Sequence, residues 1–161
     1  MMRLKTRLLA ATISAAAIAA ATAGAAQAAP TLTPSGPYTA PASIAVTGTV
    51  PTALAGTATH YAIAECNIGA VNPATWAQRC DGDTGAFTSL NALSSGTYSG
   101  NITISDVFDD VDFSGATSPT TTTFCAASAG SDPCAVLVSF YEIVGGVPQF
   151  VGIDYRPVTF H

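Results

Sequence analysis

Hydrophobic and polar residues alternate with a period of two over much of this chain. The clearest case ends at a cysteine, where alternate positions form two sets: Tyr61, Ile63 and Glu65, and Ala62, Ala64 and Cys66. Alternation of this kind predicts a β-strand with one face turned to a core. A polar loop then returns the chain to Cys80. A loop held at the end of a rigid strand is a favourable place for a binding site.

The same pattern recurs between turn residues along the rest of the chain. We expect further strands near residues 31–33, 43–50, 97–105, 120–125, 135–144 and 149–160, the last being one strand or a pair. Residues 81–85 have turn chemistry, and Gly145-Gly146 predicts a second turn. No segment after residue 28 predicts a helix. About seven short strands at this spacing predict an all-β fold, an antiparallel sandwich.

The first 28 residues predict a secretory signal peptide. Three of the five basic residues lie in the first seven positions, an alanine-rich apolar run follows, and Ala26-Gln27-Ala28 provides a small-x-small cleavage pattern. A membrane anchor is the alternative, but the run is dominated by alanine and short for a bilayer. We therefore expect a secreted, extracellular protein with one domain over residues 29–161.

The charge of residues 29–161 excludes two kinds of partner. Arg79 and Arg156 are the only basic side chains in this part, which keeps all ten acidic residues and has a net charge of −8. Direct nucleic-acid binding needs a basic footprint. Anionic membranes attract basic segments and would repel this chain.

The cysteine count predicts two disulfides. The chain has four cysteines, and an even number in an exported protein favours bridges. Three pairings are open. Pairing of neighbours, Cys66 with Cys80 and Cys125 with Cys134, is favoured because each bridge closes a short loop between turn residues. Each would add about 2–3 kcal/mol to the stability. Zinc is the alternative, and the spacings do not suit it.

The sequence contains few residues or motifs that are typical of active sites, and we expect that the protein is not an enzyme. His60 begins a predicted strand and His161 ends the chain. No Gly-x-Ser-x-Gly motif and no phosphate loop occurs. Two disulfides would leave no thiol nucleophile.

An acidic run is the main candidate for metal or carboxylate chemistry. It contains Asp106, Asp109, Asp110 and Asp112, without the ligand order of a helix-loop-helix calcium site. We expect a solvated loop and no metal. A hydrolase that uses Asp109 and Asp112 as paired carboxylates is an alternative function.

Large apolar residues gather on or next to the predicted loops. They are Ile68, Trp76, Phe87, Phe108 and Phe113. Aromatic residues at strand ends usually fill a core. Beside a disulfide-held loop they can instead line a cleft for a flat, apolar ligand.

Several short segments carry a resemblance to a known family. They are Ala28-Ala29-Pro30-Thr31, Ala55-Gly56-Thr57, Phe87-Thr88-Ser89, Phe113-Ser114-Gly115 and Val158-Thr159-Phe160, together with two short cysteine loops in order. Over nearly all of residues 29–161 the chain resembles the neocarzinostatin family, the apoproteins of bacterial enediyne chromoproteins.

The resemblance implies a fold and a function. The fold is an immunoglobulin-like, seven-stranded antiparallel sandwich. The function is antibiotic: the protein, which we expect to be a monomer, holds a labile, hydrophobic enediyne chromophore non-covalently, protects it and releases it. The released chromophore damages DNA, so DNA binding would belong to the chromophore. No tightly required cofactor is implied.

The resemblance also assigns site residues. Phe87 and Phe113 correspond to residues that stack on the ligand, and Ser139 corresponds to the pocket serine. The Cys66–Cys80 bridge would form the floor of the cleft. Ile68 stands where the family has tryptophan, and we hypothesise that Trp76 fills that space. An interaction module without a chromophore is the alternative, with residues 106–112 or the last hairpin as the contact surface.

Overall fold

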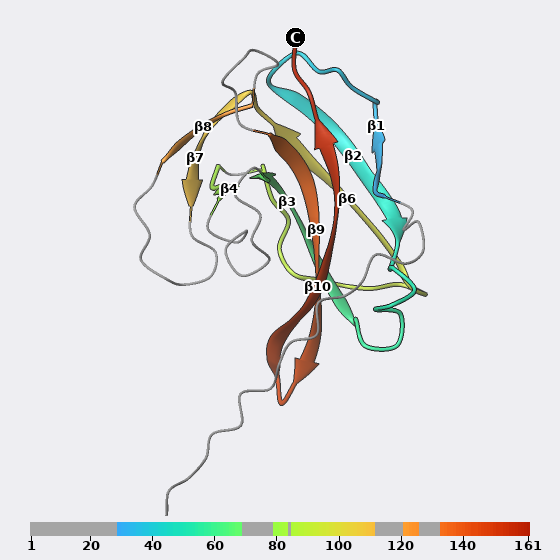
Figure 1. Cartoon of the computed structure of the whole chain (residues 1–161). Coiled ribbons are helices and arrows are strands. Elements are labelled where there is room, and N and C mark those ends of the chain that lie inside the picture. The colour runs from blue at the N-terminus through green and yellow to red at the C-terminus, as the bar shows by residue number, and fades with distance from the viewer. Residues whose placement is uncertain (1–28, 69–78, 84, 112–120, 126–132) are drawn as a thin grey trace, which may run out of the picture.

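The computed structural model describes residues 29–68, 79–83, 85–111, 121–125 and 133–161. Within these residues the chain forms antiparallel strands in two sheets and no helix (Figure 1). The predicted all-β sandwich with two disulfides is therefore confirmed. The described part contains no helix long and apolar enough to cross a membrane. Residues 1–28, Trp76 and Phe113 lie outside it.

The smaller sheet has three strands in the order β1-β2-β6. They are β1 (Thr31–Thr33), β2 (Ala42–Thr49) and β6 (Thr97–Ile104). The β2 and β6 strands pair along their whole length, from Ala42 opposite Ile104 to Thr49 opposite Thr97. All three strands were expected from the alternation of apolar and polar residues.

The larger sheet has seven strands, six of which follow one another in the order β10-β9-β3-β4-β7-β8. They are β10 (Val147–Val158), β9 (Cys134–Val144), β3 (His60–Asn67), β4 (Cys80–Asp81), β7 (Val107–Val111) and β8 (Thr122–Phe124). The seventh, β5 (Asn91–Ala92), pairs with the start of β3. Figure 1 shows the small sheet on one side of β3 and β9, with β4, β7 and β8 on the other side.

The main core lies between the two sheets. Its fully buried side chains come from alternate positions and include Ile44, Val46, Ile63, Ile104, Val136, Val138 and Phe140. Burial of each such side chain contributes about 1.5–3 kcal/mol. The sheets approach closely at Gly100, where a Cβ atom would lie 2.8 Å from Cδ1 of Ile63. Strand alternation therefore determines which residues form this core.

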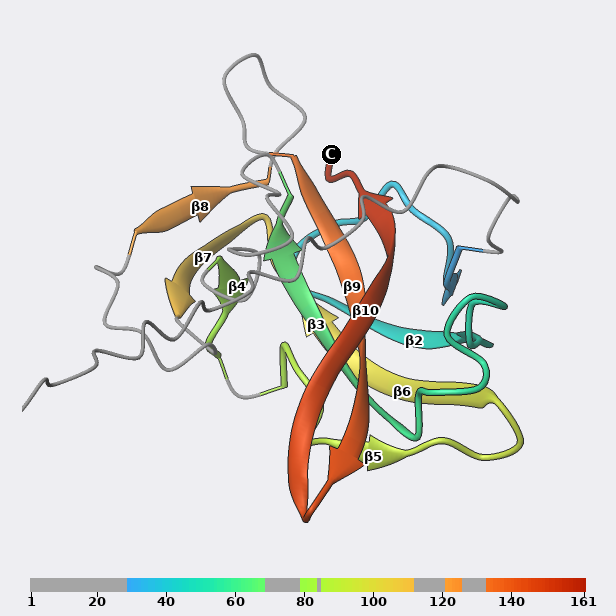
Figure 2. The ribbon, with the colours of Figure 1, turned by 60° about the horizontal axis from the view of Figure 1, so that its bottom comes forward.

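A long hairpin joins β9 to β10. Gly145 and Gly146 form its turn with positive φ values of 60° and 83°, which glycine adopts without steric cost. The pairing register shifts between Phe150 and Gly152. The tip of the hairpin projects beyond the other labelled strands (Figures 1 and 2). The last segment is thus one strand, which the sequence had left open.

Two predictions about turns and loops were wrong. Asp81, expected in a turn, lies in β4, and residues 107–111, expected in a solvated acidic loop, form β7. These short strands pair with each other, Cys80 opposite Val111 and Asp81 opposite Asp110. Long-range partners, which sequence alternation does not reveal, hold both segments extended. The described residues therefore contain ten strands where about seven were expected, and the additional ones are short.

Candidate functional site

The Cys66–Cys80 disulfide lies in the middle of the larger sheet. The two residues are direct partners across β3 and β4, with an S–S distance of 2.02 Å and a Cα–Cα distance of 3.9 Å. A second bridge joins Cys125, just after β8, to Cys134 at the start of β9. These are the neighbour pairs that the sequence favoured. The first bridge covalently joins the ends of the segment that contains residues 69–78.

The two faces of β3 and β9 bury different groups of residues. Ile63 and Val138 belong to the main core, whereas the alternate positions belong to a second apolar cluster. In this cluster Cys66, Cys80, Ala135 and Leu137 are buried, and Ala64, Ile68 and Ile153 pack against them. We call this side of β3, β9 and β10 the outer face. Ile68, a predicted site residue, packs with the cluster at its edge.

Phe87 lies on the outer face beside β3. It forms an antiparallel bridge with Ala64, and directly opposed residues place their side chains on the same face. The amide of Glu65 donates to the carbonyl of Ala86 at 3.2 Å, and the amide of Thr88 donates to that of Ile63 at 2.8 Å. Phe87 is 37% exposed. The structure thus places this predicted site residue near the first disulfide, with part of its ring open to solvent.

A second exposed ring lies on the same face at the opposite edge. Tyr155 of β10 is directly opposite Leu137 of β9, which is in turn opposite Ala64 of β3. Phe87, Ala64, Leu137 and Tyr155 therefore form one row across the sheet. We call it the aromatic row. With strands about 4.8 Å apart, it spans about 14 Å. Tyr155 is 45% exposed and Leu137 only 1%, so rings flank a covered, apolar centre.

Tyr155 and Leu137 were not identified as site residues from the sequence. Alternation in β10 groups Ile153, Tyr155 and Pro157 on one face, and this signal was present. Which residues of β9 they meet depends on the register of the hairpin. That register is set by the Gly145-Gly146 turn and by the shift near Gly152.

Ser139 supplies a polar group next to the aromatic row. It pairs with Ala62 on β3 and Ile153 on β10, one row along from Leu137, and is almost buried. A side-chain hydrogen bond from Ser139 opposes the rise that burial causes in the pKa of Tyr141. The ring of Tyr141 also packs edge-on against Phe150, with centroids 6.1 Å apart. The predicted pocket serine therefore lies on the outer face, while the predicted Phe113 and Trp76 fall outside the described residues.

A buried acid lies on the core face of the same strand. Glu65 is 0% exposed, and its Oε2 accepts a hydrogen bond of 2.8 Å from the amide of Ser105, while Oε1 has no partner. Burial, with smaller contributions from the charges of Asp81 and Asp106, raises the pKa of Glu65 from 4.5 to about 8. The carboxyl is therefore largely neutral at pH 7, which suits its apolar surroundings.

Asp110 is buried, contrary to the solvated position expected for it. Its carboxylate is paired with Arg79 and accepts hydrogen bonds from the hydroxyls of Thr121 at 2.7 Å and Thr123 at 2.6 Å. Thr123 also accepts a bond of 3.3 Å from Nδ2 of Asn67. This network joins β4, β7 and β8 to the end of β3. The acid was misplaced because its partners lie far away in sequence.

Two of the remaining candidates for catalysis have a hydroxyl as their hydrogen-bond partner. Nδ1 of His60 lies 2.9 Å from Oγ1 of Thr59, and Asp109 accepts a bond of 2.8 Å from Oγ1 of Thr122. Asp112, the other half of the carboxylate pair, lies outside the described residues. Within the described part of the chain, no three side chains of the metal-binding types are grouped to hold an ion.

Comparisons with known proteins give little further information. No protein family matches the chain, and no curated protein matches it. Among solved structures, the solution conformation of apokedarcidin is similar to this chain. The similarity covers 84% of this chain and all of apokedarcidin, at 18% identity and a TM-score of 0.48. A likeness of this size does not support a functional assignment.

Proposed function

We propose that the outer face binds a flat, hydrophobic small molecule without a covalent bond. The aromatic row carries this proposal, because it holds two partly exposed rings, Phe87 and Tyr155, on either side of Ala64 and Leu137. Large aromatic side chains gain by burial, and these two keep surface available for a partner. A planar ligand would pack against the exposed parts of these rings, because Leu137 between them is already covered.

The energetics favour such a ligand. Each Å² of apolar surface removed from water contributes about 25 cal/mol, and contact with an aromatic ring adds about 0.5–1.5 kcal/mol. The Cys66–Cys80 bridge holds the strands beneath the row, so that little conformational freedom is lost on binding. Ser139 and Tyr141 would orient a polar group of the ligand.

The resemblance to the neocarzinostatin family suggests the chemical nature of the ligand. An enediyne-type chromophore would be held, protected and released to damage DNA, and antibiotic activity would then belong to the chromophore. All four cysteines are bridged, so no thiolate is present to attack a reactive guest. The net charge of −8 over residues 29–161 opposes direct contact between protein and DNA. The predicted signal peptide would direct this carrier to the outside of the cell.

The test uses Nile red, an uncharged planar dye, as the probe for the outer face. The variant Phe87→Ala combined with Tyr155→Ala should bind the dye at least about tenfold more weakly, since two ring contacts are lost. Titration followed by dye fluorescence measures the change. Phe124→Ala is the matched control, because Phe124 is an exposed phenylalanine on β8 that is not part of the row. Equal affinities for the double variant and the native protein would overturn the proposal.

A further inference from the structure

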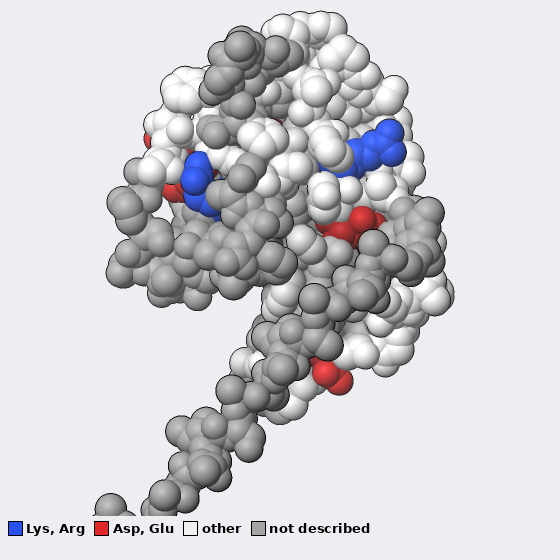
Figure 3. All heavy atoms as spheres, in the orientation of Figure 1, with Lys and Arg blue, Asp and Glu red and all other residues white. Residues whose placement is uncertain are grey.

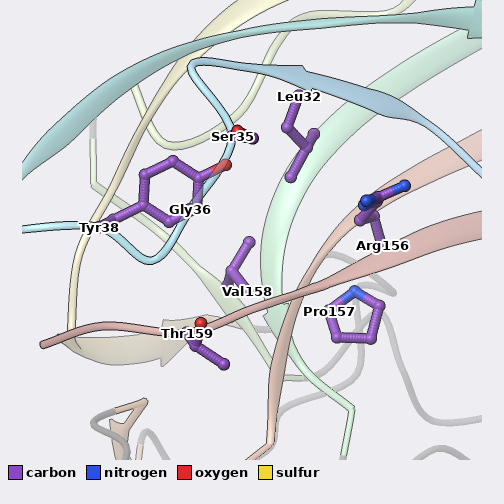
Figure 4. Close-up of a pocket in the computed structure, with 8 residues that line it drawn as sticks. All are labelled: Leu32, Ser35, Gly36, Tyr38, Arg156, Pro157, Val158 and Thr159. Carbon is purple, nitrogen blue, oxygen red and sulfur yellow. The ribbon is translucent and has the colours of Figure 1, made fainter.

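A pocket of about 170 Å³ lies beside the last residues of β10 and does not include the residues of the aromatic row. It opens between the segment that follows β1 and the last residues of β10 (Figure 4). Tyr155 and Arg156 are consecutive in β10, so their side chains leave the strand on opposite faces. Arg156 therefore lines the pocket from the face opposite Tyr155, and Pro157, which shares the face of Tyr155, also contributes to the lining.

Hydrogen bonds fix the walls of the pocket. The amide of Tyr38 donates to the carbonyl of Thr159 at 2.9 Å, and the amide of His161 donates to the carbonyl of Tyr38 at 3.0 Å. The hydroxyl of Tyr38 donates to the carbonyl of Pro34 at 2.9 Å. The ring of Tyr38 also packs on Gly36, where a Cβ atom would lie 2.7 Å from the ring. The two walls are thus tied together before any ligand binds.

Apolar and polar groups occupy different parts of the pocket. Figure 4 shows the ring of Tyr38 on one side and Arg156 on the other, with Leu32 and Val158 between them. Leu32, Tyr38 and Val158 are nearly buried, whereas Arg156 is exposed. Ser35 and Thr159 add hydroxyl groups to the lining. A ligand in this pocket would therefore meet an apolar floor and a cationic rim.

Arg156 carries a charge that no acid neutralises within the described residues. Of the two arginines in this part of the chain, Arg79 is paired with Asp110, and Arg156 forms no ion pair. The carboxylate of Asp154 accepts a bond from the amide of Tyr155 at 2.9 Å instead. The charge of Arg156 reaches the pocket, because it lowers the pKa of Tyr38 against the larger rise caused by burial. Figure 3 shows two separate basic areas on this face, together with several acidic areas among uncharged residues.

We propose that this pocket binds a small organic carboxylate. The planar guanidinium of Arg156 matches the two oxygens of a carboxylate, and Leu32, Tyr38 and Val158 would contact its apolar body. The volume equals about five or six waters at about 30 Å³ each, which suits a ligand of one ring or a short chain. Arg156 is the only basic residue that lines the pocket, and residues 29–161 have a net negative charge. The pocket therefore favours a ligand with one negative charge over a multiply charged phosphate.

Sodium benzoate is the probe for this pocket, and benzamide is its uncharged counterpart of nearly equal shape. Titration of the purified, isotope-labelled protein is followed by amide NMR shifts. Benzoate should shift the amides of Ser35, Gly36, Tyr38, Arg156, Val158 and Thr159. Benzamide should bind at least about tenfold more weakly, because charged hydrogen bonds are the stronger ones. Equal binding of the two compounds, or shifts confined to other residues, would overturn the proposal.

Variants distinguish the contribution of the Arg156 guanidinium to benzoate binding from that of the net charge of the protein. Arg156→Gln should weaken benzoate binding at least about tenfold, and Arg156→Lys should retain part of it. Gln149→Glu is the matched control, because it makes the same change in net charge at an exposed position of β10 outside the pocket. Native-like affinity in Arg156→Gln, or an equal loss in Gln149→Glu, would contradict the assignment. The spectrum of each variant shows directly whether it is folded.

Discussion

The two faces of β3 and β9 differ in how completely their apolar side chains are buried. On the core face, Ile63 and Val138 are directly paired and completely buried. On the outer face, Ala64 pairs with Leu137, and the large rings of the row, Phe87 and Tyr155, stay partly exposed at the ends. The apolar side chains of the core face are thus already buried in the folded protein, and this burial stabilises the fold. The outer face retains apolar area that a ligand can still bury.

The largest expected effect concerns stability and the core face. Ile63→Ala should lower the free energy of unfolding by about 2–5 kcal/mol, because it removes a fully buried side chain between the sheets. Phe87→Ala, on the outer face, should cost less than about 1 kcal/mol, since its ring is only partly covered. Urea unfolding measures both. Equal losses for the two variants would show that the outer face is an ordinary part of the core.

Removing each disulfide in turn tests whether the outer face depends on its own bridge. The expected loss of stability is somewhat smaller than for Ile63→Ala. Replacing Cys66 and Cys80 together by alanine should lower the unfolding free energy by about 2–4 kcal/mol, and replacing Cys125 and Cys134 should do the same. Only the first change should also weaken Nile red binding, because only Cys66 and Cys80 belong to the outer-face cluster. If both pairs affect dye binding equally, rigidity of the whole domain, and not of this face, supports the site.

The buried acid on the core face predicts a pH dependence. The pKa of Glu65 rises from 4.5 to about 8 on folding, so the native state keeps a proton that the unfolded chain releases between these values. Stability should therefore fall as the pH rises through this window, by on the order of 1 kcal/mol per pH unit. Glu65→Gln should remove most of this decline and be the more stable protein at pH 8.

Other groups limit how far Glu65→Gln can flatten the pH profile. Burial also raises the pKa values of Asp81 and Asp154, which contribute a decline of the same sign. The comparison needs urea unfolding at several pH values from 4 to 9 for both proteins. A variant with the same slope as the native protein would show that Glu65 does not control the profile. Dye binding to the outer face should remain unchanged, since Glu65 faces the core.

Much of the fold could be predicted because it depends on local alternation. The segments that became β2, β3 and β6 have a period of two, β9 places Val136, Val138 and Phe140 on one face, and glycine or proline lies in the turns between them. The short strands β4 and β7 were missed. Their extended shape depends on partners such as Val111 opposite Cys80 and on the Arg79–Asp110 pair. Asp110 is paired with an arginine that lies far away in the sequence. The sequence alone therefore predicts that its carboxylate is exposed to solvent.

The candidate site was predicted only in part, for a related reason. Phe87 was identified as a large apolar residue beside a predicted loop, and Ser139 through the family resemblance. The structure brings both to the outer face. Tyr155 was missed, because its place in the row depends on the pairing of β10 with β9. The Arg156 pocket was missed as well, since it joins residues near Tyr38 to the far end of the chain.

The sequence by itself determined the all-β class, the positions of the longer strands and the favoured cysteine pairs, because alternation, turn residues and short loops are local properties. Tertiary structure decided which residues share a face and a row, which acids are buried, and where an arginine remains without an acid partner among the described residues. These features depend on strand register and on burial. Both arise only when segments far apart in the chain pair with one another.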